Sequence, residues 1–335
     1  IEYSMNVLPR TNPVSICGYH IRESGATPAQ EIGYAILIAN AYIDNVLKRG
    51  YDVDDFVGRF SFNLNVFGNI WEQVAKFRAA RKLWARNLKE KYGVKKDSNM
   101  YLRGLFGGGG YGLTKAQPEN NIMRGAYYAL SAALAGAQTI ALCSYDEAYT
   151  IPTPHSAIIS LRTLQLLMDE IGLRDTVDPL AGSYFIETIT KEMEGKIEEE
   201  MDKIEKAGGI VQAVATGYVQ RLVSQQAYAY EKGLQSGELK KVGLNIHTEG
   251  EPMEVELHEY TGESAKKQVE ALKQLRRERN DREVTRTLKD LEAATRAGKN
   301  VMPYLVEACK AYATVGEMAR VFRDVFGEFE EPGLF

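Results

Sequence analysis

Short apolar segments alternate with amphipathic helical stretches along the first 190 residues, and this alternation constrains the fold more than any other feature of the chain. Each apolar run favours a strand, ends in a loop, and is followed by a stretch with helical periodicity. The predicted strands are 13–17, 60–66, 100–106 and 139–144, and the predicted helices are 28–49, 69–91, 120–137 and 156–170. Strands that alternate with helices usually pair in parallel beneath those helices. The chain is therefore predicted to have an α/β fold.

The composition changes near residue 190, where long charged helices replace this alternation. Residues 263–296 carry Lys, Arg and Glu in helical register, and residues 300–326 have the pattern of an amphipathic helix pair. We therefore divide the chain into an α/β unit at 1–190 and a mostly helical extension, or linker, at 191–335.

Four strand–helix units are about half of a complete (β/α)8 TIM-type barrel, which needs roughly 200 or more residues of alternating pattern. A half barrel would leave two sheet edges unpaired and its apolar floor exposed. Because the first residue is Ile1 rather than Met, we expect the other strands to come from an N-terminal segment or from a separate chain. A small open α/β sheet, complete by itself, is the alternative.

The composition excludes several classes of function. With 41 Lys and Arg against 45 Asp and Glu, the chain lacks the basic excess expected of a nucleic-acid-binding protein. No apolar run approaches the roughly 18 residues of a membrane span, and the first residues do not resemble a signal peptide. Three scattered cysteines, Cys17, Cys143 and Cys309, fit a reducing cytoplasm and argue against a zinc site or a disulfide framework.

The loop after the first predicted strand holds a dense cluster of functional groups. It contains Tyr19, His20, Arg22 and Glu23. Loops at the carboxyl ends of parallel strands form the active sites of such folds. A neutral imidazole there could donate a hydrogen bond to a carbonyl oxygen. A helix-capping loop with polar surface residues is an equally good interpretation of the residues alone.

Two further segments suit a ligand, although each also has an ordinary structural interpretation. Arg59 and Ser61, one residue apart, would point the same way and suit a phosphate or carboxylate; a rim ion pair is the alternative. The run Gly107–Gly110 could let the backbone approach a ligand or adopt positive φ; a flexible loop is the alternative. The run is neither a Walker loop nor a GxGxxG motif.

The residues after the fourth strand, Asp146 and Glu147, are adjacent carboxylates that point in different directions, so they do not by themselves form an acid–base pair. His155 is expected to lie at the start of a helix, in a capping position.

Six short motifs occur in the order found in the coenzyme B12-dependent acyl-CoA mutases. They are GYHIRESGAT, DDFVGRFSF, RKLWA, PENNIMR, AQTI…SYDEAYTIPT and DPLAGSYFIE. The chain resembles this family over nearly its whole length, and in particular the large, catalytic subunit of methylmalonyl-CoA mutase. The resemblance implies a (β/α)8 barrel with the acyl-CoA threaded along its axis, of which this chain would be the second half plus the following linker. It also implies an isomerase that uses adenosylcobalamin (coenzyme B12) in a radical rearrangement.

The resemblance assigns a role to each matching residue. Tyr19 and His20 would be catalytic, meeting the cobalamin and the thioester carbonyl. The cofactor-binding residues would be Glu23, Glu147 and Ala148, and we add Gly107 from the glycine run. The residues that bind coenzyme A would be Arg59, Ser61 and Gln138.

The cobalt ligand is expected in a different domain or subunit. Asn245 to Gly250 nearly spells the DxHxxG loop that offers a histidine to cobalt, but Asn245 replaces the aspartate, so His247 is not expected to bind metal. The expected partners are the N-terminal barrel half and a B12-binding domain or small subunit, in a dimer or heterotetramer. A non-catalytic scaffold and a stand-alone CoA-binding protein are the alternative functions.

Two departures from the family pattern bear on the substrate. Leu105 and Gly107 stand where methylmalonyl-CoA mutase has His and Gln, and 140–145 replaces another polar stretch. Fewer polar groups favour a branched or larger acyl group over a malonyl carboxylate. The arginine that holds that carboxylate in the family would lie upstream of Ile1.

Overall fold

The structure is a computed structural model that describes residues 1–250 and 254–332. Residues 12–258 form one compact unit, and residues 1–11 together with 259–331 form a second. Each unit is described by itself below. In the described ranges, no helix is both long and apolar enough to cross a membrane.

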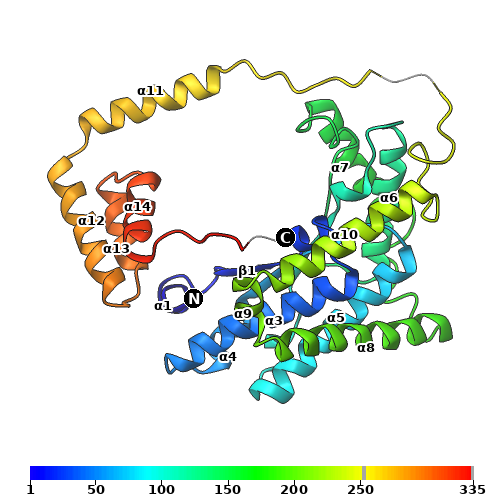
Figure 1. Cartoon of the computed structure of the whole chain (residues 1–335), viewed down its shortest axis with the longest axis horizontal. Helices are drawn as coiled ribbons and strands as arrows, with labels where there is room; N and C mark the ends of the chain where they lie inside the picture. The colour runs from blue at the N-terminus through cyan, green and yellow to red at the C-terminus, as the bar shows by residue number, and fades with distance from the viewer. Residues whose placement is uncertain (251–253, 333–335) are drawn as a thin grey trace. The chain divides into compact units, whose positions relative to one another are not determined.

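The first unit is built on a four-stranded parallel sheet. Its strands are β1 Val14–Cys17, β2 Phe60–Val66, β3 Gly104–Gly108 and β4 Thr139–Leu142, paired in chain order. Figure 1 labels the first of these strands, β1, among the helices of the unit. In register, Val14 pairs with Phe60, Phe62 with Gly104, and Leu105 with Thr139. The predicted α/β fold with parallel strands and covering helices is confirmed; its continuation into a barrel stays a prediction.

Helices follow the strands as the alternation predicted. In the first unit they are α2 Tyr19–Glu23, α3 Pro28–Lys48, α4 Val53–Phe56, α5 Ile70–Tyr92, α6 Asn120–Leu134, α7 Pro154–Asp169, α8 Tyr184–Lys206, α9 Ile210–Ala215 and α10 Tyr218–Ser236. Thr27 and Gln30 form a capping box at the start of α3, with Pro28 in the first turn. Asn69 caps α5, which ends at Gly93 in the left-handed conformation.

One face of the sheet forms the core. Phe62, Leu64 and Phe106 on this face are buried beneath the covering helices. The ring of Phe77 from α5 stacks on Phe106 with 4.1 Å between centroids, and Trp84 meets Phe62 edge-on at 5.0 Å. Burying a large aromatic side chain contributes about 1.5–3 kcal/mol, so these contacts fix α5 on the sheet.

The opposite face of the sheet is open and carries mostly small or polar side chains. Alternate strand residues share a face, and here the exposed members include Ser15, Leu105, Thr139 and Ala141. Parallel sheets are ordinarily covered on both faces. The exposed floor that we expected of a half barrel is therefore present, but it is less apolar than expected.

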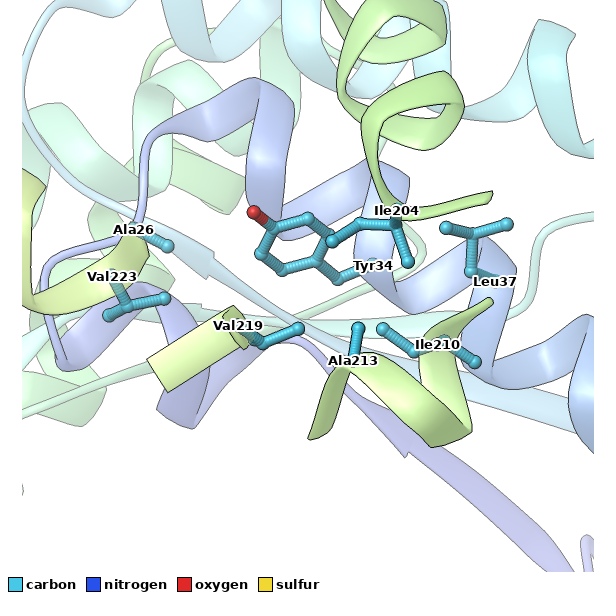
Figure 2. Close-up of a cluster of buried hydrophobic side chains, with 8 residues drawn as sticks. All are labelled: Ala26, Tyr34, Leu37, Ile204, Ile210, Ala213, Val219 and Val223. Carbon is cyan, nitrogen blue, oxygen red and sulfur yellow. The ribbon is translucent and has the colours of Figure 1, made fainter. Parts of the chain in front are cut away.

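Helices beyond residue 190 pack on the α/β part. Figure 2 shows Tyr34 and Leu37 of α3 meeting Ile204 of α8 and the apolar side chains of α9 and α10. A salt bridge from Lys82 to Glu194, at 2.9 Å, also joins α5 to α8. The change in composition at residue 190 thus lies inside a compact unit. The boundary between an α/β unit and a helical extension at residue 190 stays a prediction.

The second unit is helical, with α1 Glu2–Val7, α11 Glu263–Glu278, α12 Asp281–Arg296, α13 Met302–Lys310 and α14 Val315–Phe326. The charged stretch 263–296 is two helices rather than one, because Asn280 caps the second. Arg279 donates to both carboxylate oxygens of Glu317, at 2.8 and 2.7 Å. Val284, Ala308 and Ala313 form the small core between the last three helices.

Candidate active site at the two edges of the sheet

The turn from β1 into α2 places Tyr19 and His20 at the carboxyl edge of the sheet. His20 is exposed, and its Nδ1 lies 3.2 Å from the Sγ of Cys17, the last residue of β1. The rings of Tyr19 and His20 meet edge to face, with centroids 5.5 Å apart. A Cβ on Gly18 would lie 3.0 Å from side-chain atoms of Glu31 and Leu64, which explains the glycine at this tight junction. The strand end therefore holds an accessible imidazole in a defined position.

Tyr19 faces Cys143, and both groups are protonated at neutral pH. The Tyr19 hydroxyl lies 3.7 Å from Cys143 Sγ. Burial, together with the nearby Cys143 and Glu23, raises the pKa of Tyr19 well above its usual range. Burial and the nearby Glu147 raise the pKa of Cys143 to about 11. Tyr19 is thus a neutral hydroxyl that can donate a hydrogen bond but cannot readily act as a phenolate base.

Glu23, predicted to bind the cofactor, is engaged within the protein. Its Oε1 accepts a hydrogen bond from the side-chain amide of Asn65, and its Oε2 accepts one from the backbone N–H of Tyr111 at 2.9 Å. Asn65 is at the end of β2, and Tyr111 follows the glycine run. The carboxylate of Glu23 therefore ties two neighbouring strand ends to α2.

A fully buried ion pair lies behind this edge, and the sequence analysis did not find it. Lys76 Nζ lies 2.8 Å from Glu31 Oε2, and neither side chain is exposed. Glu31 Oε1 accepts the backbone N–H of Asn65 at 2.6 Å, and Lys76 donates to the carbonyl of the same residue. β1 ends opposite Asn63, so no residue of β1 pairs with Asn65. The side chains of Glu31 and Lys76 bond to the Asn65 backbone in place of a neighbouring strand. Burial lowers the pKa of Lys76, and Glu31 opposes that shift.

The glycine run is a packing feature of this edge. None of Gly107–Gly110 has positive φ, contrary to one of the predicted uses. A Cβ on Gly107 would lie 2.8 Å from the Tyr19 ring, and one on Gly109 would lie 2.3 Å from Asn65 Oδ1 and 2.4 Å from Glu23 Oε1. Neighbouring side chains thus occupy the space that we had expected the glycines to leave for a ligand. The assignment of Gly107 to the cofactor stays a prediction.

The loop after β4 presents one exposed and one buried carboxylate. Glu147 and Ala148 are exposed, and partial burial with the nearby Asp146 and Glu23 raises the pKa of Glu147. Asp146 is only 1% exposed, yet neither of its carboxylate oxygens has a hydrogen-bond donor among the described residues. A buried carboxylate without partners is costly, so this edge favours an additional donor.

The three predicted CoA-binding residues lie at the other end of the strands. Arg59 is exposed in the turn before β2, and Gln138 is exposed immediately before β4. Ser61 is the second residue of β2 and donates its hydroxyl to the Val14 carbonyl at 3.0 Å. The five-residue step from Ser61 to Val66 spans about 17 Å at the usual rise of a strand. The structure thus groups these residues at the amino edge, away from His20.

Arg59 is not part of a rim ion pair in the described part of the chain. The sequence had suggested that Arg59 and Ser61 share a strand face. Arg59 instead lies in the turn before β2, so the two residues do not share one. Its guanidinium is therefore accessible to a phosphate.

The sequence singled out two other histidines, His155 and His247. His155 is exposed in the first turn of α7, where Thr153 and Ser156 form the capping box. His247 is exposed, and its carbonyl accepts a hydrogen bond from Gln117 at 2.9 Å. Asn245 holds the preceding turn through bonds to the Leu234 and Leu239 carbonyls. In the described residues, no three His, Cys, Asp or Glu side chains gather as metal ligands.

A four-stranded parallel sheet with polar side chains at its carboxyl edge is the arrangement in which α/β enzymes place their active sites. The chain belongs to the methylmalonyl-CoA mutase family, whose model matches residues 1–328. The family predicted from the sequence motifs is thereby confirmed.

Curated relatives match almost the whole chain. It is 36% identical over 337 residues to the 2-hydroxyisobutanoyl-CoA mutase large subunit of Aquincola tertiaricarbonis, covering 100% of this chain and 60% of that protein. It is 35% identical over 331 residues to the methylmalonyl-CoA mutase of Rhizobium meliloti, covering 98% and 46%. The human mitochondrial methylmalonyl-CoA mutase is 32% identical over 329 residues, covering 98% and 44%. The chain spans about half the length of the curated relatives that it matches.

Proposed function

We propose that this chain forms part of the (β/α)8 barrel of an adenosylcobalamin-dependent acyl-CoA mutase, an isomerase that moves a group between neighbouring carbons of an acyl-CoA. The observation that supports the proposal is that the predicted site residues fall at the two ends of the strands, with one open face of the sheet between them. Membership of the family supports it. One face of the sheet is uncovered, and the outer strands β1 and β4 each pair with a neighbour on one side only. Both features favour further strands that would complete the barrel.

The open face provides a path for a long substrate. Arg59 and Gln138 at the amino edge would bind the phosphates and pantetheine amides of coenzyme A. Ser61, whose hydroxyl already bonds to Val14, would contact the substrate with its remaining lone pairs. The acyl thioester would then reach the carboxyl edge, where His20 is accessible. The separation of the two edges suits an extended ligand that runs along the strands.

The residues of the carboxyl edge fit adenosylcobalamin in part. Glu147 and Ala148 are exposed, and the Glu147 side chain makes no hydrogen bond within the described residues, so they could hold the cofactor. The unpartnered buried oxygens of Asp146 also suit an added donor. Glu23 is committed to Asn65 and Tyr111, and we assign it a supporting role behind the cofactor. When bound, adenosylcobalamin supplies the homolytic bond cleavage that begins radical chemistry.

The chain's own residues would position the thioester and exclude water. His20 would donate a hydrogen bond to the thioester carbonyl oxygen and stabilise charge or spin that develops there. Tyr19, held protonated by its buried surroundings, would offer a second donor beside it. Donors of this kind bind the carbonyl oxygen without taking a proton from the substrate, which suits a rearrangement rather than a hydrolysis.

The partners follow from the same proposal. The N-terminal half of the barrel would supply the remaining strands, and a cobalamin-binding domain or small subunit would hold the cobalt. The Aquincola relative is named a large subunit, which supports a multi-subunit assembly, either a dimer or a heterotetramer. A cytoplasmic location is consistent with three free cysteines in the described residues.

We further propose that the substrate is a different branched acyl-CoA, one without a free carboxylate, rather than methylmalonyl-CoA. Leu105 is exposed on the open face, where an apolar group favours an alkyl branch over a free carboxylate. The space at Gly107 belongs to the Tyr19 ring, so Leu105 rather than the glycine run would set this preference. The name of the Aquincola relative includes a branched acyl group, which agrees with the proposal.

The test is reconstitution of the assembly. This chain is combined with the N-terminal barrel segment, a cobalamin-binding subunit and adenosylcobalamin, and then supplied with 2-hydroxyisobutanoyl-CoA or methylmalonyl-CoA. We expect turnover only when all parts are present, with the higher kcat/KM for 2-hydroxyisobutanoyl-CoA. Turnover by this chain alone would contradict the need for partners. Tight binding of both acyl-CoAs without turnover would indicate the scaffold function, and a preference of tenfold or more for methylmalonyl-CoA would contradict the role of Leu105.

A further inference from the structure

A cavity of about 670 Å³ lies in the first unit, beside the loops that follow β2 and β3. It is bounded by the loop after β2, by one face of α6, and by α10 with the segment that follows it. This volume is in the range of small-molecule sites, about 300–1,000 Å³. None of the nine residues that we assign to catalysis, cofactor or coenzyme A lines it. The cavity is therefore a separate candidate for ligand binding.

The walls of the cavity are aromatic and apolar. Tyr127, Tyr128 and Tyr230 contribute rings, and Phe67 and Met123 add apolar surface. Tyr128 is held in place by a hydrogen bond from its hydroxyl to the Gly112 carbonyl at 3.3 Å. Tyr127 is 61% exposed and Met123 is 52% exposed, so part of this surface is accessible from solvent. Flat apolar groups pack well against such rings.

The polar part of the cavity is positively charged. Arg124, Lys240 and Lys241 line it, and none of its described lining residues is Asp or Glu. The Arg124 guanidinium is fixed by bonds to Thr114 Oγ1 and Asn121 Oδ1, both 2.7 Å, and to the Val242 carbonyl at 2.6 Å. Such a fixed cation presents its charge without needing to be reordered by a ligand.

Lys241 is a partly buried cation with donors to spare. Its Nζ makes one long bond, 3.4 Å, to the Tyr111 carbonyl, and no ion pair involves it in the described part of the chain. An ammonium has three donors, so two remain for a ligand. Burial and the charge of Arg124 lower the pKa of Lys241 to about 8, and Glu231 of α10 only partly opposes them. Two cations that destabilise each other in a partly buried cavity favour an anion between them.

We propose that this cavity binds a small organic anion, a carboxylate or phosphate carried on a flat apolar group. The charged group would bind Lys241 beside Arg124, and the flat group would pack against Tyr127 and Tyr230. The proposal does not depend on the mutase activity, because it involves none of the residues of that site.

The proposal is tested by calorimetric titration of the full chain with four probes. These are phenyl phosphate, benzoate, inorganic phosphate and the neutral benzyl alcohol. We expect phenyl phosphate or benzoate to bind at least about tenfold more tightly than benzyl alcohol and than inorganic phosphate. The tighter of the two aryl anions identifies the charged group. Equal binding of the neutral probe, or of inorganic phosphate, would overturn the proposal, as would no binding of either aryl anion below about 10 mM.

Three variants locate the binding. Lys241→Met should weaken binding of the aryl anion about tenfold or more. Lys232 is an exposed lysine of α10 outside the cavity, so Lys232→Met should leave that affinity unchanged. Lys241→Arg should keep the affinity, which separates loss of charge from loss of folding. An affinity of Lys241→Met within twofold of the unaltered chain would overturn the assignment.

The pH dependence gives an independent measurement. The charged groups that face Lys241 are Arg124 from α6 and Glu231 from α10, with Tyr230 and Lys240 nearby. Only protonated Lys241 attracts an anion, so affinity should fall as pH rises through about 8. Lys241→Arg should remove this fall, because arginine stays protonated. A fall of equal size in Lys241→Arg would overturn the role of Lys241.

Discussion

At the carboxyl edge of the sheet Glu23 is bonded to the Asn65 side chain and to the Tyr111 backbone, whereas at the amino edge Arg59 and Gln138 are exposed. Glu23 joins Asn65 to the backbone of Tyr111, and the buried Lys76–Glu31 pair holds Asn65 from behind. The first edge is organised before any ligand arrives. The second offers free donors that a ligand must order.

This difference suits two kinds of work. Chemistry benefits from groups held in place, because preorganised donors do not need to reorient as charge develops. Binding the far end of a long flexible substrate needs charge and access rather than rigid geometry. We therefore expect changes at the carboxyl edge to affect folding stability and turnover, and changes at the amino edge to affect substrate binding.

The largest expected effect is on the buried ion pair. Lys76→Met should lower the free energy of unfolding by about 3–5 kcal/mol, because it leaves Glu31 buried without its cation. The double variant Lys76→Met/Glu31→Leu should recover part of this loss. Urea unfolding of both variants measures the effect, with Arg59→Ala as the amino-edge control, which should change stability little. A single variant within about 1 kcal/mol of the unaltered chain would show that the pair does not support this edge.

The second prediction concerns turnover in the reconstituted assembly. His20→Ala should reduce kcat by about 10²–10³, the scale for loss of one oxyanion-type donor. Binding of the acyl-CoA, measured by calorimetry, should change much less, because His20 would act on the carbonyl and not on the coenzyme A phosphates. Turnover within about threefold of the unaltered enzyme would make His20 a structural residue.

The third prediction applies to the amino edge. Arg59→Ala should raise KM about tenfold or more while kcat stays nearly the same, since a charge-assisted hydrogen bond to a phosphate is worth about 1.5–3 kcal/mol. Arg59→Lys should recover part of the affinity through its charge alone. Steady-state kinetics over a range of acyl-CoA concentrations separates the two constants. An unchanged KM in Arg59→Ala would remove this edge from the substrate site.

The parallel sheet and the residues at its strand ends were predictable from sequence because periodicity and loop chemistry are local signals. The strand runs at 13–17 and 60–66 and the cluster around His20 needed no knowledge of distant contacts. The Lys76–Glu31 pair was not predictable, because Lys76 lies in a helix with many other charges, Glu31 lies in the first turn of α3 where an exposed carboxylate is common, and only packing shows that both are buried. A charged residue on an otherwise apolar helix face was the one available signal.

The glycine run shows how a correct local observation can lead to an incomplete interpretation. Four consecutive glycines indicated close approach, and the structure has it. The approaching groups are Tyr19, Asn65 and Glu23 of the same chain, which come from other elements of the fold. Sequence alone cannot distinguish a ligand from a neighbouring side chain at such a position, because both require the same missing Cβ.

The smallest expected effect separates packing from flexibility in that run. Gly109→Ala places a Cβ 2.3 Å from Asn65 Oδ1 and 2.4 Å from Glu23 Oε1, so it should lower the free energy of unfolding by about 1–3 kcal/mol. Gly195→Ala is the matched control, because its Cβ would meet nothing within 4 Å in the middle of α8. There alanine should stabilise the chain by up to about 1 kcal/mol, through its higher helix propensity. Urea unfolding of the two variants should therefore move in opposite directions. Equal stability of Gly109→Ala and the unaltered chain would mean that the loop yields easily, and the carboxyl edge would then be no more rigid than the amino edge.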